Sequence, residues 1–170
     1  MIWGKHKIGE QEYDLSHLNP FILDVTPNVV GAPTFKTLVS FGHHTFTREW
    51  SHGINAEEFR FSHNADCRCF CPNRHKNSCH LPRIITNSAR GKAYFSNQHN
   101  YLLVENIAGL NGPYAVFFKL EQAKSPKLDA VMFVVSAYEK PALPKKLPAI
   151  SFATLIAKTA KGEIITRPKK

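Results

Sequence analysis

Four short runs rich in β-branched and aromatic residues lie between residues 93 and 138, and they constrain the fold more than any other feature of the chain. Turn-forming residues such as Asn, Gly, Pro and Ser separate the runs. The four runs are 93–96, 101–107, 114–122 and 130–138. Because short connections favour antiparallel neighbours, this segment predicts a β-meander.

Other segments predict elements around this meander. The run 130–138 is apolar at consecutive positions up to Ser136, which is typical of a central strand covered on both faces. Pro82 fits the first turn of a short helix that carries Ile84 and Ile85 inward. Further candidates are a strand at 37–41, a short helix at 55–59, and at 150–160 either one helix or a strand followed by a helix.

These elements predict a single α+β domain, an antiparallel β-meander of about four to six strands packed on a few helices. A chain of 170 residues can bury most of the surface its unfolded form exposes without disulfides or metal. Its expected parts are an N-terminal part at 1–58, a basic Cys/His-rich loop and short helix at 59–92, the meander at 93–140, and at 141–170 a Pro/Lys-rich loop, a last element and a basic tail.

The positive charge is concentrated in the last two thirds of the chain. The whole sequence has 22 Lys and Arg against 13 Asp and Glu, a formal net charge of +9. Residues 1–58 carry 4 basic and 7 acidic side chains, residues 59–118 carry 7 and 2, and residues 119–170 carry 11 and 4. This distribution indicates a surface for nucleic acid, although lysines that only keep a small domain soluble would give the same balance.

Composition and motifs also exclude several classes of protein. The sequence has no apolar run of 18 residues and no secretory signal pattern at its start, and its four cysteines fall within 67–79, so we expect a cytoplasmic protein without a membrane partner. It contains no P-loop, no dinucleotide-binding glycine pattern and no H-E-x-x-H motif. These absences argue against a nucleotide hydrolase, a dehydrogenase and a zinc protease.

The chain has nine histidines, and His is the side chain that exchanges a proton near neutral pH. If the segment 39–47 is extended, His43 and His44 lie on opposite faces, so that one faces the core and the other a cleft. The alternative is a core histidine that bonds only to backbone. At the end of the presumed central strand, Ser136 and Tyr138 share a face and present two hydroxyls together.

The cysteines form a C-x-C-x-C run, with a Cys-His pair eight residues after it. Thiolate and imidazole are ligands that zinc prefers, but the C-x2-C spacing of zinc knuckles is missing. A structural zinc site remains a hypothesis; its ligands would be Cys67, Cys71, Cys79 and His80. Otherwise these residues are buried hydrophobes or loop thiols, and we expect no other cofactor.

Arginines alternate with aromatic residues around the cysteines, among them Arg60, Arg74 and Arg83. Guanidinium groups bind phosphate and aromatic rings stack on unpaired bases, so this mixture suits RNA or another single-stranded nucleic acid. The alternative is that the aromatic residues belong to the core and the arginines to its solvated rim.

An ordered set of short motifs resembles a family of small proteobacterial proteins labelled "stationary phase growth adaptation protein". The motifs lie at 13–21, 39–47, 74–82, 100–105 and 135–138. The family pattern has His at His17 and His44, Arg at Arg74 and Ser at Ser78, but it implies no established activity. Ser78 therefore joins the candidate nucleic-acid-binding residues. The C-x-C-x-C run departs from the family pattern, which weakens the zinc hypothesis.

A helix followed by strands that end in Ser-Ala-Tyr also looks like the barnase/EndoU/colicin/RelE group of ribonuclease toxins. This fold-level resemblance implies a metal-independent endoribonuclease that cleaves RNA by attack of the ribose 2'-OH, with an antitoxin or another protein as a partner. In that hypothesis His44 is the base or acid, Arg74 clamps the phosphate, Tyr138 or His17 moves the second proton and Ser136 positions the substrate. The alternative is a non-catalytic basic module that binds RNA, DNA or a protein, with or without structural zinc.

Overall fold

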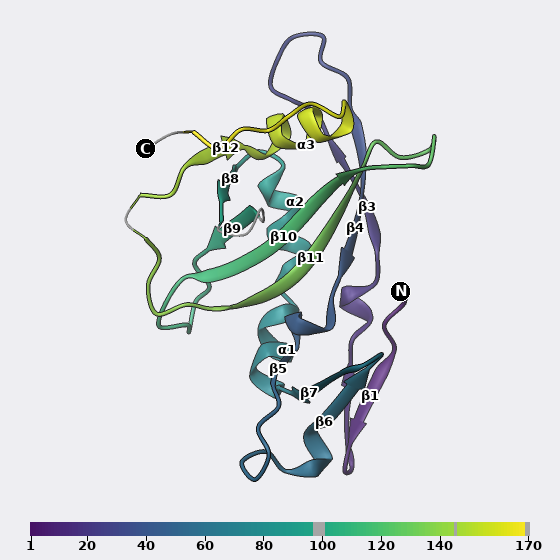
Figure 1. The fold of residues 1–170 in the computed structure, drawn as a ribbon, viewed down its shortest axis with the longest axis vertical. Coiled ribbons are helices and arrows are strands. Elements are labelled where there is room, and N and C mark those ends of the chain that lie inside the picture. Colours follow the sequence, from purple (N-terminus) through teal and green to yellow (C-terminus); the bar gives the residue numbers. More distant parts are fainter. Residues whose placement is uncertain (97–100, 145, 169–170) are drawn as a thin grey trace.

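The largest element of the fold is a seven-stranded sheet (Figure 1). The computed structural model describes residues 1–96, 101–144 and 146–168. The order of the sheet is β12 (Ala149–Ser151), β8 (Lys92–Phe95), β9 (Tyr101–Glu105), β10 (Tyr114–Gln122), β11 (Ala130–Glu139), β4 (Phe35–Phe41) and β3 (Phe21–Val25). Together with helices on and beside the sheet, these strands confirm the predicted α+β class.

Strands β8 to β11 form the predicted meander, and each is antiparallel to the next. Strand β4 joins the far side of β11 in parallel, with Thr37 to Phe41 opposite Ala130 to Val134. The register between β10 and β11 shifts between Phe117 and Phe118, so one extra residue, Val135, lies in β11 at that point. This bulge immediately precedes Ser136 and Tyr138 and sets the direction in which they project.

Helix α3 (Phe152–Ala160) covers one face of the sheet and follows directly on β12, so the last element is a strand followed by a helix. Its apolar side buries Phe152, Leu155 and Ile156. The ring of Phe152 lies 6.0 Å from that of Phe118 on β10. This contact places the main core between α3 and the sheet.

The second face of β11 is more open than the sequence predicts. Phe133 is 42% exposed, and Val131 and Val135 are only partly buried. The expectation of a central strand covered on both sides is therefore wrong, although β11 does lie inside the sheet. Apolar residues at consecutive positions here supply one buried face and one apolar face that meets solvent.

The segment 59–92 is richer in structure than the predicted loop and short helix. It contains β6 (Arg60–His63), β7 (Asp66–Phe70), α1 (Pro72–Ser78) and α2 (Leu81–Ser88). β7 pairs with β6 and with β5 (Thr47–Glu49) in a small sheet, and β1 (Lys5–Ile8) with β2 (Gln11–Asp14) makes a hairpin. In Figure 1 these small strands lie at the end of the molecule away from α3, with α1 close to the junction.

The described part of the chain also contains the 3-10 turns η1 (Ser16–Leu18), η2 (His43–Thr45) and η3 (Glu57–Phe59). The last of them replaces the predicted helix at 55–59. The described residues of 140–148 lie outside helices and strands, as expected for a Pro-rich loop. Strand β12 begins directly after them. The predicted turn at 97–100 and the last two residues of the basic tail lie outside the described residues. Among the described residues, we find no helix with the length and apolar character needed to cross a membrane.

Candidate active site

The turn that follows β4 brings two histidines to the same side. Gly42 is buried, and its N–H donates to the carbonyl oxygen of Val134 on β11 at 2.8 Å. A Cβ at this position would lie 2.9 Å from Cζ of Phe133 and 3.3 Å from the carbonyl oxygens of Val134 and Val135, so a larger residue would force neighbouring atoms to shift. The chain then turns through η2, where the Thr45 hydroxyl donates to the Gly42 carbonyl at 2.8 Å. The expectation of an extended segment with His43 and His44 on opposite faces is therefore wrong.

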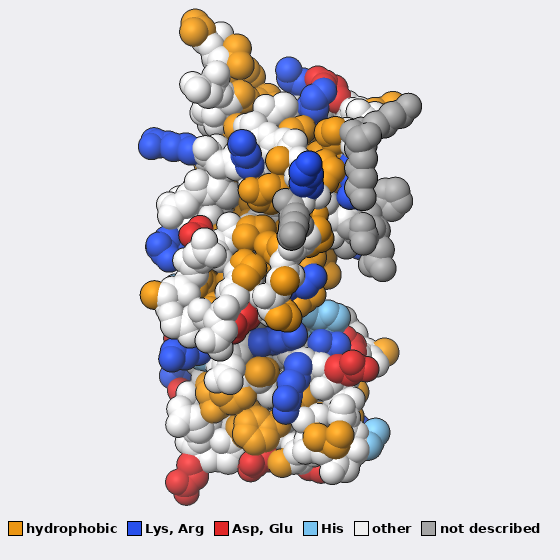
Figure 2. All heavy atoms as spheres, turned by 90° about the vertical axis from the view of Figure 1, so that its left-hand side faces the viewer, with side chains coloured by type: hydrophobic (Ala, Val, Ile, Leu, Met, Phe, Trp, Pro, Cys, Tyr) orange, Lys and Arg blue, Asp and Glu red, His pale blue; other side chains and the backbone are white. Residues whose placement is uncertain are grey.

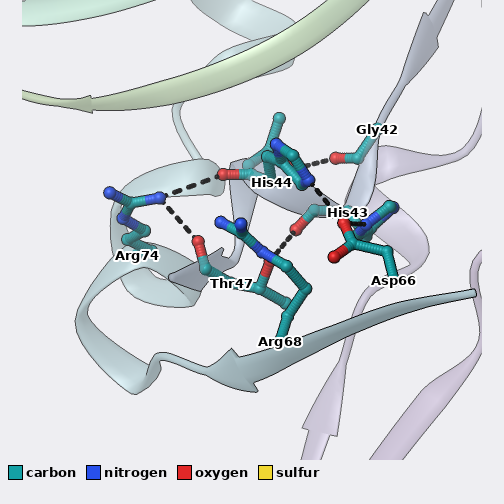
Figure 3. A network of polar contacts seen from close by, with 8 residues as sticks. Gly42, His43, His44, Thr47, Asp66, Arg68 and Arg74 are labelled. Carbon is teal, nitrogen blue, oxygen red and sulfur yellow. Dashed lines mark hydrogen bonds and ion pairs between the residues drawn. The ribbon is translucent and has the colours of Figure 1, made fainter. Parts of the chain in front are cut away.

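Both histidines reach one carboxylate. Nε2 of His43 and Nε2 of His44 each lie 2.9 Å from Oδ2 of Asp66 (Figure 3). An ionised carboxylate only accepts hydrogen bonds, so each imidazole donates from Nε2. The hydrogen bond from His44, which has the larger effect, and the one from His43 lower the pKa of Asp66 to about 2. Burial lowers the pKa of His43, and the hydrogen bond to Asp66 offsets this only in part. His43 is therefore neutral at pH 7.

A tight hairpin between β6 and β7 positions this carboxylate. His63 and Asp66 face each other across the turn, and Asn64 has a φ of 54°, in the left-handed region that Asn adopts more readily than most residues. From Asp66, side chains alternate along β7. Asp66 and Arg68 project toward η2 and Thr47, while Cys67 and Cys69 lie on the opposite face.

Arg74 on α1 completes the group. Its Nη1 donates to the carbonyl oxygens of Thr47 at 2.6 Å and of His44 at 3.4 Å (Figure 3). Its guanidinium carbon lies 5.0 Å from the ring centroid of Tyr138 on β11. Burial lowers the pKa of Arg74, but a guanidinium stays charged in proteins. Arg68 also reaches Thr47, whose hydroxyl accepts from its Nε at 3.3 Å.

Tyr138 and Ser136 share one face of β11, as the sequence predicts. Ser136 is paired with Phe117 on β10, and the Tyr138 ring stacks on the Phe117 ring with a centroid separation of 5.4 Å. The ammonium group of Lys140 lies 5.6 Å from the centroid of the Phe117 ring. Arg74 therefore links the backbone of the turn that carries His44 to the ring of Tyr138, at the junction of the small sheet and the large one.

Two further residues of the expected site lie in another cluster. Nε2 of His17 is 2.7 Å from the Ser78 hydroxyl, which donates to the carbonyl of His75 at 2.7 Å, so His17 must be the donor in their bond. His75 in turn bonds to the carbonyl of Asp14 at 2.9 Å. Ser78 is completely buried, so its hydroxyl has no access to a nucleic acid. This cluster ties η1 and β2 to α1.

The other two predicted nucleic-acid ligands lie apart from His44. Arg60 is exposed on the cysteine face of the small sheet, where its Nε donates to Sγ of Cys67 at 3.2 Å and its guanidinium lies 5.8 Å from the Trp50 ring centroid. Arg83 is exposed on α2. Of the predicted nucleic-acid ligands, the structure therefore joins only Arg74 to His44.

The structure does not assemble the predicted zinc ligands Cys67, Cys71, Cys79 and His80. Cys67 lies on β7 and Cys71 directly follows that strand, while Cys79 follows α1 and its thiol donates to the carbonyl of His75. Across the described residues, the group whose ligand atoms converge as a metal site requires is His43, His44 and Asp66. Cys69 and Cys71 instead line a surface pocket of about 350 Å³ beside Arg48.

Asp66 is the residue of this group that sequence reasoning misses. An isolated acid beside three cysteines carries no motif, but the Asn64-Ala65 turn between two alternating runs is a hairpin signal.

No curated protein and no solved structure matches the chain. A family model matches residues 5–160, nearly the whole length, and the protein is a member of the YjaZ family.

Proposed function

We propose that this protein is a metal-independent endoribonuclease that cleaves RNA through attack of a ribose 2'-OH on the adjacent phosphate. The observation that carries the proposal is the position of the His44–Asp66 pair next to Arg74, which itself lies against Tyr138. In this arrangement His44 can accept a proton, Arg74 can bind phosphate, and the Tyr138 hydroxyl can donate a proton.

His44 is the base in this scheme. Its Nε2 donates to Asp66, which fixes the orientation of the ring and leaves proton exchange to Nδ1. Nδ1 accepts the proton of the 2'-OH as the 2'-oxygen forms a bond to phosphorus. The bond between phosphorus and the 5'-oxygen breaks, and the Tyr138 hydroxyl supplies the proton that this oxygen takes up. The products are a 2',3'-cyclic phosphate and a 5'-hydroxyl.

Arg74 suits the phosphate. Both of its backbone hydrogen bonds come from Nη1, and a guanidinium has five N–H donors, so it can hold the two carbonyls and still donate to phosphate oxygens. These bonds fix the charge before the substrate arrives, which is how an active site stabilises a charged transition state without reorganising. Ser136 lies on the same face of β11 as Tyr138, and in this proposal it contacts the ribose or the phosphate.

The substrate surface in this proposal is the open face of β10 and β11. Phe117 and Tyr138 offer rings for unpaired bases, and Lys119 and Lys140 lie beside them. Figure 2 views the molecule from the left-hand side of Figure 1, and on that side basic side chains border an apolar strip. In this proposal the enzyme works in a reducing cytoplasm, with a protein partner that neutralises it.

The chemistry can be tested with a substrate that contains a single ribose. A deoxyribose oligonucleotide with one internal ribose, incubated with EDTA, is expected to break only on the 3' side of that ribose. Mass spectrometry should find a 2',3'-cyclic phosphate and a 5'-hydroxyl. Cleavage of the all-deoxy strand at the same rate would exclude attack by a 2'-OH.

The second candidate function is a non-catalytic module that binds RNA or DNA. The stacked Phe117 and Tyr138 rings beside Lys140 favour it, because this arrangement binds single strands without any chemistry. Such a module would shift RNA in a native gel with a steep dependence on salt concentration. The RNA would leave the complex at its original length, which separates this function from cleavage.

A further inference from the structure

We propose that His43, His44 and Asp66 form a binding site for one divalent transition-metal ion of the zinc type, and that the bound ion switches off RNA cleavage. Metal binding is inferred from the geometry of these three residues alone. The effect on cleavage rests on the proposed function of His44.

Two of the three distances between the ligand atoms are already close to those found around such an ion. Nε2 of His43 and Nε2 of His44 are each 2.9 Å from Oδ2 of Asp66, and the three atoms lie within 4.8 Å of one another. Ligands that bind a zinc-type ion at about 2.1 Å lie about 3.0 to 3.4 Å apart. An ion can therefore take the place of the two N–H protons once the Asp66 carboxylate draws back to make room for it.

Separate backbone features hold the three ligands in place. Consecutive residues of η2 supply both imidazoles, whose rings are perpendicular with centroids 4.6 Å apart. The carboxylate comes from the first residue of β7, behind the Asn64 turn. Rings packed around His43 restrict it further, with the Phe61 ring stacked at 6.2 Å. The site is thus preformed, which favours binding.

The site is open on one side. The side chain of His43 is 17% exposed, that of His44 34% and that of Asp66 43%. Three protein ligands and access to solvent leave positions for water or another exchangeable ligand, as in zinc sites that are not purely structural. Two imidazoles and one carboxylate suit zinc, cobalt, nickel or iron better than magnesium or calcium, which prefer oxygen ligands only.

Metal binding and the proposed catalysis need different forms of His44. In the metal-free protein its proton is on Nε2 and the lone pair of Nδ1 is available to the 2'-OH. When Nε2 binds a metal ion, the neutral imidazole carries its proton on Nδ1. Such a ring cannot accept the proton of the 2'-OH. The ion and the cleavage reaction therefore exclude each other.

Cobalt(II) added to the full-length, chelator-treated protein tests the site directly. Absorption spectra and calorimetry should give one ion per chain, with ligand-field bands but no thiolate charge-transfer band. His43→Gln keeps a donor for Asp66 but removes the imidazole, so it should weaken cobalt binding by about tenfold or more. Absence of stoichiometric binding by the wild-type protein would overturn the site, whatever its action on RNA.

A matched control excludes the cysteines. A variant with Cys67→Ser, Cys71→Ser and Cys79→Ser should bind cobalt with the affinity of the wild type and an unchanged spectrum. If this variant loses the ion while His43→Gln keeps it, the site is a thiolate site and the proposal is wrong. Ligation by nitrogen and oxygen in both proteins supports it.

The switch is measured as the ratio of RNA cleavage rates with saturating cobalt and with EDTA, taken separately for each protein. The wild type should slow by about tenfold or more, and His43→Gln should respond little at the same ion concentration. Equal rates in the wild type would overturn the switch, and faster cleavage with cobalt would overturn both the switch and a metal-independent mechanism. RNA that stays intact in EDTA while cobalt still binds would remove the proposed function but not the site.

Discussion

The guanidinium of Arg74 lies over the ring of Tyr138, 5.0 Å from its centroid, while Nη1 of the same side chain is bonded to the carbonyls of His44 and Thr47. One side chain therefore connects α1, the turn after β4 and the end of β11. This connection joins the small sheet and the large sheet into one candidate active site.

Arg74→Lys should impair both stability and cleavage. A lysine has no planar fork that can bond two carbonyls and lie flat on an aromatic ring. We expect a loss of about 1–3 kcal/mol in the free energy of unfolding and a fall of about 100-fold in the RNA cleavage rate. Urea unfolding and a cleavage time course measure the two effects. Arg90→Lys, at an exposed position after α2, is the matched control. If Arg74→Lys were as stable and as active as Arg90→Lys, the role of Arg74 in linking the two sheets and binding phosphate would be wrong.

Ser78→Ala should destabilise the fold. Ser78 is completely buried, and its hydroxyl accepts a hydrogen bond from His17 and donates one to the carbonyl of His75. Removing the hydroxyl leaves the His17 N–H without its partner. A buried group that loses its hydrogen bond costs about 1–3 kcal/mol, which thermal or urea unfolding will detect. Unchanged stability together with weaker RNA binding would show that Ser78 contacts RNA instead.

Stability should decrease as the pH falls below 7. Burial lowers the pKa of His6 and of His17 below the usual value of 6.5; nearby His75 lowers that of His17 further, and Asp14 partly opposes this. Each folded-state pKa is lower than its unfolded value, so the unfolded chain binds protons first and folding loses free energy as the pH falls through 6.5.

His6→Phe tests the contribution of one of these groups. The His6 ring packs against Phe61 and Phe70, with centroids at 5.2 and 4.9 Å, and a phenylalanine can occupy the same place without a proton to bind. The slope of unfolding free energy against pH between 7 and 5 should be smaller in this variant. An identical slope would mean that His6 does not titrate differently in the folded and unfolded protein.

Gly42→Ala should disturb the turn that carries both histidines. The added Cβ would meet Cζ of Phe133 at 2.9 Å and the carbonyl oxygens of Val134 and Val135 at 3.3 Å. Overpacking of this kind costs about 1–3 kcal/mol. Gly4→Ala, which meets nothing within 4 Å, is the control. If the two variants unfold at the same denaturant concentration, the contact between Gly42 and β11 is not tight in solution.

The sequence predicts those parts of the fold that depend on local patterns. The meander from β8 to β11 is visible because each strand and its turn lie together in the chain. The parallel pairing of β4 with β11 joins residues more than ninety positions apart, and no local pattern specifies it. The same holds for the contact between Arg74 and Tyr138.

For the site, residue type alone identifies His44, Arg74, Ser136 and Tyr138 but not their geometry. Alternation in 39–47 suggests an extended segment, whereas Gly42 packs against β11 and Thr45 bonds back to it, which produces a turn. This turn aims both imidazoles at Asp66. His17 and Ser78 match a family pattern equally well, yet the Ser78 hydroxyl is buried and bonded to His17 in a separate cluster.

The most direct test of the account is the cleavage of a labelled single-stranded RNA by purified wild-type and His44→Ala protein, with EDTA present, on a denaturing gel. Circular dichroism of both proteins confirms that the variant is folded. We expect discrete fragments from the wild type and a rate lower by about 100-fold or more from the variant, the usual contribution of a general base. Equal cleavage by the two proteins would contradict the role of His44, and intact RNA in both lanes would contradict the proposed ribonuclease activity itself.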